Sequence, residues 1–99
     1  MQGMDTPEIF IARVDATAGD CGAYVKGDRH ALNVFVRASS NDEAVQVSEK
    51  VVGRNGWTEV KILRTGKLDP ARLEKPEHVR AAAEAAQLGA SIVVYRQVQ

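Results

Sequence analysis

The sequence is poor in residues on which several protein classes depend. Cysteine occurs once, at Cys21, among 99 residues. A single cysteine excludes a framework of internal disulfides and is typical of a reducing compartment. Proline occurs three times, and the chain has no internal repeat and no low-complexity segment. These absences favour an ordinary globular domain.

Long apolar runs and an excess of one charge are also missing. No run approaches the roughly 18 residues of a membrane span, and the first dozen residues carry two acidic side chains and no cationic segment. Thirteen basic and thirteen acidic side chains give no net charge. A non-specific grip on nucleic acid or on an anionic membrane is therefore not expected. We expect a cytoplasmic protein without a membrane partner.

Length and composition predict one folded domain over residues 1–99. A hydrophobic fraction of 44% and a charged fraction of 26% are ordinary for a soluble protein. A chain of this size buries roughly 60–70% of its unfolded surface in a single core. Residues 1–7 are polar and contain glycine, so we expect them to be poorly ordered.

The stretch 30–64 predicts a strand, a capped helix, a turn and a second strand. Ser40 and Glu43 have the spacing of a capping box, which predicts a helix over Ser40–Arg54. Asn55 and Gly56 tolerate the left-handed backbone at which helices end. The helix carries an apolar stripe at helical spacing: Ala44, Val47, Ser48, Val51 and Val52. The preceding strand alternates, with Leu32, Val34 and Val36 on one face, and the helix is expected to cover that face.

The segments on either side complete the predicted sheet. Residues 8–14 read as a strand that is apolar on both faces, so alternation does not identify its core side. Residues 15–22 read as a loop and residues 23–28 as either a short strand or a turn. The first strand should pair antiparallel with the strand that ends at Ala38, because sequential strands usually neighbour one another.

The C-terminal third contains a second helix and a last strand. Residues 65–75 form a polar connection whose conformation the sequence leaves open. Pro76 suits the first turn of a helix, and alanine-rich residues Glu77–Leu88 continue it. Gly89 ends the helix, and Ser91–Val98 read as the final strand.

These elements predict an α+β fold arranged as a two-layer sandwich. A four-stranded sheet, mostly antiparallel or mixed, is expected to carry both helices on one face. A ferredoxin-like plait is the nearest common architecture. The hairpin lies at the front of this chain instead of between the two strand and helix units, so the strand order stays open.

Four short segments carry a family resemblance: GAYV after the front loop, the strand LNVFVRA, a helix with an acidic start, and the following GW. With these segments the chain resembles small bacterial domains of unknown function with a plait-like α+β architecture. The resemblance spans most of the chain and implies no particular activity.

Residues capable of chemistry do not form a recognisable motif. Cys21 lies between glycines, and no basic residue is nearer in sequence than Lys26 to activate its thiol. His30 and His78 lack the paired spacing of metal ligands, and the glycines do not match a nucleotide-binding loop. We therefore assign no catalytic, cofactor-binding or metal residue, and expect no cofactor. The polar residues favour a non-enzymatic module over an enzyme.

The sheet face opposite the helices is the remaining candidate site. On the predicted strands it collects large side chains that the helices should leave open: Phe35, Arg37, Leu63, Val93 and Tyr95. Such a patch predicts a protein-binding or self-associating module, most simply a homodimer. Two alternatives stay open: an enzyme or ligand-binding protein with a loop pocket near Cys21 and His30, and an RNA-binding sheet face. Zero net charge and the absence of an RNA-stacking motif count against RNA.

Overall fold

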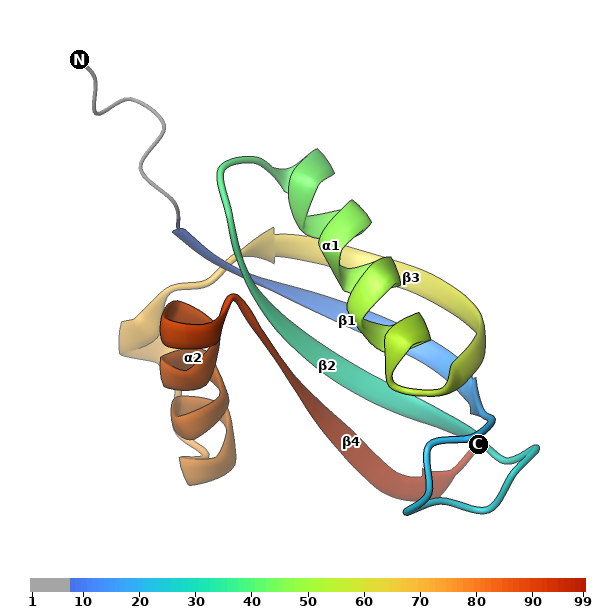
Figure 1. The fold of residues 1–99 in the computed structure, drawn as a ribbon. Helices are drawn as coiled ribbons and strands as arrows, with labels where there is room; N and C mark the ends of the chain where they lie inside the picture. The colour runs from blue at the N-terminus through green and yellow to red at the C-terminus, as the bar shows by residue number, and fades with distance from the viewer. Residues whose placement is uncertain (1–7) are drawn as a thin grey trace.

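The structure, a computed structural model, describes residues 8–99, so the prediction for residues 1–7 lies outside the described residues. Figure 1 shows a long, twisted sheet with one helix lying along it and a second helix at one end. The elements follow one another along the chain: β1 (Glu8–Ala18), β2 (Arg29–Ala38), α1 (Asn41–Arg54), β3 (Trp57–Lys67), a short 3₁₀ helix (Pro70–Arg72), α2 (Pro76–Leu88) and β4 (Ala90–Val98).

The sheet is antiparallel throughout and has the order β3-β1-β2-β4. The predicted front hairpin is confirmed, with β1 and β2 paired from Glu8 and Ala38 to Thr17 and Arg29. This long hairpin occupies the centre of the sheet, so β3 and β4 are left to pair with its two outer sides. The order therefore differs from that of the ferredoxin-like plait.

Two strands run further than their local sequence predicts. Residues 15–18, expected in a loop, continue β1 because Ala16 and Ala18 keep pointing inward and are 0% and 1% exposed. Residues 65–67, expected in a connection, continue β3 along β1. Residues 23–28 form turns and bends in the β1–β2 connection. Tertiary pairing supplies hydrogen-bond partners to short polar segments that have little strand propensity of their own.

The predicted capping of α1 is confirmed. The Glu43 amide donates to Ser40 Oγ at 3.1 Å, and the Ser39 amide donates to Glu43 Oε1 at 2.7 Å. The first bond satisfies a first-turn amide that has no partner within the helix, and the second holds the residue before the cap instead of Ser40 itself. α1 therefore starts where its sequence predicts, one residue after the Ser40 cap.

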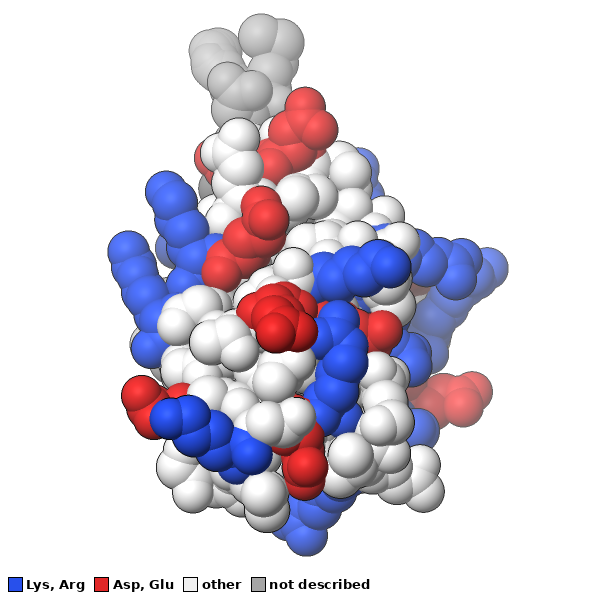
Figure 2. Space-filling model, turned by 90° about the vertical axis from the view of Figure 1, so that its right-hand side faces the viewer, with Lys and Arg blue, Asp and Glu red and all other residues white. Residues whose placement is uncertain are grey.

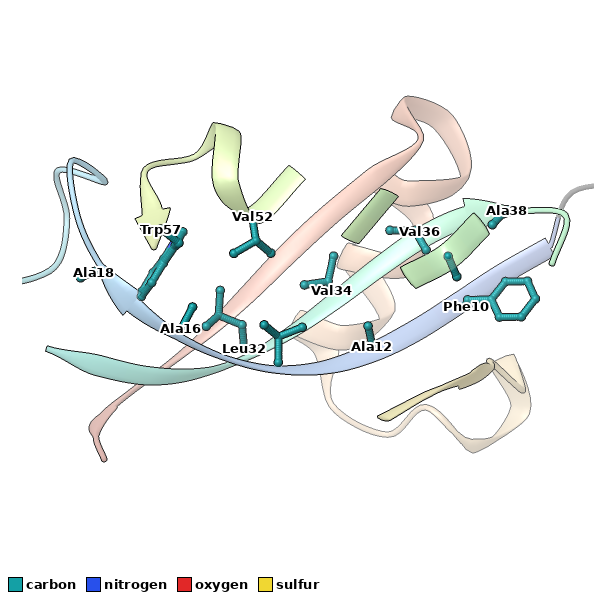
Figure 3. Packing of buried hydrophobic residues seen from close by; sticks show 12 residues of the cluster. Phe10, Ala12, Ala16, Ala18, Leu32, Val34, Val36, Ala38, Val52 and Trp57 are labelled. Atoms are coloured by element: carbon teal, nitrogen blue, oxygen red, sulfur yellow. The ribbon is translucent and has the colours of Figure 1, made fainter. Parts of the chain in front are cut away.

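The main core lies between α1 and the sheet face that we call the α1 face. This face carries the inward side chains of both central strands: Phe10, Ala12, Val14, Ala16 and Ala18 of β1, and Leu32, Val34, Val36 and Ala38 of β2. Figure 3 shows Leu32, Val34 and Val36 on the side of the sheet where Val52 of α1 lies. Ala44 and Val52 of α1 are fully buried against them. The predicted stripe of α1 thus covers the predicted face of β2.

The α+β class, the four-stranded sheet and the two helices are confirmed, but the expectation that both helices share one face is wrong. Ala81 and Ala85 of α2 are buried against Phe35, with Ile9 and Ile11 beside them. Odd-numbered residues of β1 and β2 point away from the α1 face, so α2 covers the opposite side, which we call the α2 face. The physical reason is that Ile9, Ile11 and Phe35 make this side apolar too. Apolar area on a second face needs a second cover.

Candidate functional site

The structure changes the accessibility of the predicted interface. Phe35 is 0% exposed because α2 lies on it, with Ala81 and Ala85 in the same cluster. The expectation that Phe35 lies on an open face is therefore wrong. Sequence alternation placed Phe35 correctly on the side opposite Val34, but it could not show that a helix covers that side.

The other predicted interface residues do not form one patch. Arg37 Nη1 donates to the Ala86 carbonyl near the end of α2 at 2.6 Å. Leu63 lies on β3 and is 48% exposed, whereas Val93 and Tyr95 lie on β4 at the other edge of the sheet. Val93 and Tyr95 are the two that can contribute to one surface, and their role in association stays a prediction.

Cys21 and His30 lie at the end of the α1 face, where aromatic side chains close the core. The His30 ring is 3% exposed, with Tyr24 and Trp57 ring centroids at 5.1 and 5.8 Å. His30 Nδ1 donates to the Tyr95 carbonyl at 2.8 Å, which fixes its orientation. Half-buried Cys21 packs against the same core, with its sulfur 3.9 Å from the Gly19 carbonyl oxygen. This arrangement suits a structural role for His30.

His78 lies on the other side of the sheet. It belongs to α2, and its ring centroid is 5.8 Å from that of Phe35. Within the described residues its buried Nε2 has no hydrogen-bond partner. The two histidines therefore lie on opposite faces, and residues 8–99 contain no group of three potential metal ligands.

The uncovered half of the α2 face holds a site that sequence reasoning missed. A groove of about 510 Å³ runs over β1 and β3, and we call it the arginine groove. Its lining comes from three strands: Ile11, Arg13, Asn33, Arg64, Thr65 and Gly66. A sequence signal did exist, since Arg13 places a charge at the alternate position directly after Ile9 and Ile11. The sequence does not show which residue of β3 lies beside Arg13.

Neighbouring side chains hold part of this groove in place. The Arg13 guanidinium carbon lies over the Tyr95 ring, 5.3 Å from its centroid, in a cation–π contact. Asn33, only 6% exposed, donates through Nδ2 to the Tyr95 hydroxyl oxygen at 2.7 Å. The bond from His30 to the Tyr95 backbone fixes the same residue from its other end. Arg13 thus packs on Tyr95, which is itself held by hydrogen bonds from Asn33 and His30.

The chemistry available in the arginine groove is that of binding. Guanidinium groups stay protonated and donate hydrogen bonds, so Arg13 and Arg64 are poor proton-transfer groups.

The distribution of charge differs on the side of the molecule that lies to the right in Figure 1. Figure 2 shows basic and acidic side chains interspersed on that side.

Comparisons with family models, curated proteins and solved structures found no match. Within residues 8–99, no helix is both long and apolar enough to cross a membrane.

Proposed function

We propose that this domain is a non-enzymatic module that associates with a second copy of itself through the free edge of β4. The observation that carries the proposal is the composition of this edge. Residues Ala90–Tyr95 contain no charged side chain and no proline, and within residues 8–99 β4 pairs only with β2. Natural proteins usually protect such an edge with charge, proline, a bulge or a covering partner.

The backbone of β4 is oriented for this pairing. The Arg37 amide donates to the Gly89 carbonyl at 2.9 Å, and the register continues with Val36 opposite Ala90 and Val34 opposite Ile92. Hydrogen-bonded and non-hydrogen-bonded pairs alternate along an antiparallel ladder. The amide and carbonyl groups of Ala90, Ile92 and Val94 therefore point away from β2, toward the free edge.

A two-fold axis at Val93 would pair the free amide and carbonyl groups of Ala90, Ile92 and Val94 with those of a second copy. Ile92 of one copy would stand opposite Val94 of the other as a hydrogen-bonded pair, and the reverse pair would form by symmetry. Both side chains lie on the α1 face, pack against the main core and remain half-buried in the single chain. Association would extend that core across the axis and remove apolar surface from water, which stabilises by about 25 cal/mol per Å².

A non-enzymatic role is supported by the positions of the reactive residues. His30 is enclosed by aromatic rings, and His78 lies on the opposite face against Phe35. An acid–base or nucleophilic mechanism needs such groups to converge on one bound substrate. His30 and His78 do not converge, because they lie in two separate clusters on opposite faces of the sheet.

Sedimentation velocity at about 10–100 μM protein tests the proposal, because a dimer with a micromolar Kd is populated in that range. We expect a dimer for the unmodified chain. Val93→Lys places two like charges opposite each other on the axis and should give a monomer. Val25→Lys is the matched control, since Val25 is 69% exposed in the β1–β2 connection and should leave the dimer intact.

A second variant separates loss of association from loss of folding. Val93 also packs against the Phe35 cluster, whereas the Ser91 side chain makes only a 3.3 Å hydrogen bond with Glu84 among the described contacts. Ser91→Lys should therefore leave the thermal unfolding of the monomer unchanged. Because a lysine on an edge strand opposes pairing with another strand, the same substitution should still dissociate the dimer. A monomeric unmodified chain at 100 μM or so, or a dimer that survives both lysine substitutions, would contradict the β4 interface.

A further inference from the structure

Arg13 and Arg64 stand directly opposite each other on neighbouring strands. Both belong to the α2 face, and both side chains are exposed. Like charges at directly opposed positions of an antiparallel pair destabilise a sheet. Among residues 8–99, the salt bridges join other side chains, and Arg13 is engaged only by the neutral ring of Tyr95. The Arg13–Arg64 pair therefore destabilises the fold, and within the described part of the chain no acidic side chain offsets the repulsion.

A β-bulge brings the two arginines together. Val14 pairs with Ile62, and the next pair is Arg13 with Arg64, so Leu63 is an extra residue in β3. Ile62 packs in the core of the α1 face, and in a regular strand the residue two positions later points to the same side. The bulge reverses this phase and places Arg64 on the α2 face beside Arg13. Bulges often redirect a side chain in this way next to binding and active sites.

The groove beside the arginines has room for a ligand. Its volume of about 510 Å³ lies within the range of roughly 300–1,000 Å³ that is usual for small-molecule sites. Gly66 lines it, and a Cβ built there would have no atom within 4 Å. Half-buried Ile11 supplies an apolar wall next to the charges. The site therefore combines two fixed positive charges with apolar surface and open space.

We propose that the arginine groove binds a small organic dicarboxylate. Each guanidinium can donate two parallel hydrogen bonds to a carboxylate, and two carboxylates would neutralise both arginines. The hydrocarbon chain between the carboxylates would lie along Ile11 and the backbone at Gly66. The support of Arg13 by Tyr95 and Asn33 lowers the cost of ordering that side chain on binding.

Titration of the ¹⁵N-labelled chain with glutarate, followed by NMR, tests the proposal. We expect saturable shifts of the Arg13, Arg64, Asn33 and Gly66 signals. Arg13→Gln and Arg64→Gln should each weaken glutarate binding by about tenfold or more, because each removes a charge-assisted hydrogen-bonding pair. Arg72→Gln is the control with the same change in charge, since Arg72 is exposed and lies outside the groove. It should leave binding unchanged.

A steric variant tests the location independently of charge. The backbone at Gly66 is compatible with a side chain and has open space around it, so Gly66→Val should fold normally and fill the groove. It should weaken glutarate binding by at least about tenfold. Binding that Gly66→Val or the arginine variants leave unchanged, an equal loss in Arg72→Gln, or saturation by inorganic phosphate without saturation by glutarate would overturn the proposal. Arg13, Arg64 and Gly66, the residues changed in this test, lie outside β4. Failure of one proposal therefore leaves the other standing.

Discussion

The two edges of the sheet differ in how they are protected from pairing with another strand. β3 departs from regular register with β1 twice, between Arg13 and Val14 and between Asp15 and Thr17. It also carries several charges along its length: Glu59, Lys61, Arg64 and Lys67. β4 pairs regularly with β2 from Ala90 to Val94 and is uncharged over Ala90–Tyr95. Bulges and lysines discourage edge pairing. β3 therefore has the features of a protected edge strand, whereas β4 has those of an inner strand.

The largest expected difference between the two edges concerns the glycines that lead into them. Gly56 precedes β3 and Gly89 precedes β4, and both have positive φ, 91° and 101°. A Cβ at Gly56 would lie 2.5 Å from the Asp20 carbonyl carbon, but at Gly89 it would meet nothing within 4 Å. We expect Gly56→Ala to lower the free energy of unfolding by about 3–4 kcal/mol, from backbone strain plus the clash. Gly89→Ala should lower it by only about 1–2 kcal/mol.

Urea denaturation followed by circular dichroism measures both glycine effects. The comparison should be made on the monomer, at protein concentrations well below the dimer Kd, because association would add to the stability. Equal losses for Gly56→Ala and Gly89→Ala would show that the backbone contact at Asp20 relaxes and does not fix the start of β3.

An intermediate effect is expected from truncating the core residues of each edge. Ile62 on β3 and Ile92 on β4 are both half-buried on the α1 face. In the monomer, Ile62→Ala and Ile92→Ala should each cost about 1–2 kcal/mol, less than a fully buried isoleucine. In the dimer only Ile92 gains further burial. Raising the protein concentration should therefore raise the Tm of Ile62→Ala but not that of Ile92→Ala, as differential scanning calorimetry would measure.

A concentration-independent Tm for both isoleucine variants and for the unmodified chain would count against burial of Ile92 in an interface. A larger concentration dependence in Ile92→Ala than in Ile62→Ala would have the same consequence.

The smallest effect is expected at the exposed position of the β3 bulge. Leu63 is 48% exposed, and Leu63→Lys should change the free energy of unfolding by no more than about 0.5 kcal/mol. It should leave the sedimentation coefficient unchanged, in contrast to Ser91→Lys on β4. A Leu63→Lys variant that becomes monomeric would indicate that association uses the β3 edge, or the sheet face on which Leu63 was first predicted.

The sequence predicted best those features that depend on neighbouring residues. The start of α1 follows from Ser40 and Glu43, which meet within one turn, and its end from Asn55 and Gly56. The alternation of Leu32, Val34 and Val36 identified the core face of β2 for the same reason. For residues 15–18 the sequence predicts a loop, because their small and polar side chains carry no local strand signal. Pairing with β2 and β3 overrides that preference.

The arginine groove lay beyond prediction because its residues meet across strands. Arg13 and Arg64 are separated by about half of the 99-residue chain and become neighbours only through the pairing of β1 with β3. Their shared face depends further on the bulge at Leu63, a deviation of a single residue. Register is set by turns, bulges and packing of the whole sheet, and one residue of slip moves a side chain to the other face.

The sequence by itself determined the α+β class, the capped first helix, the front hairpin and the main apolar face. These properties follow from period, capping and turn chemistry, which act over a few residues. Only the tertiary structure decided that α2 covers the second face, that Phe35 is buried, and that β3 and β4 form the edges. The sequence indicates two apolar faces only in part, through the consecutive residues Ile9, Phe10 and Ile11, whose side chains point to both sides of the sheet. Assigning a cover to each face requires the strand order, and that order is fixed by long-range pairing.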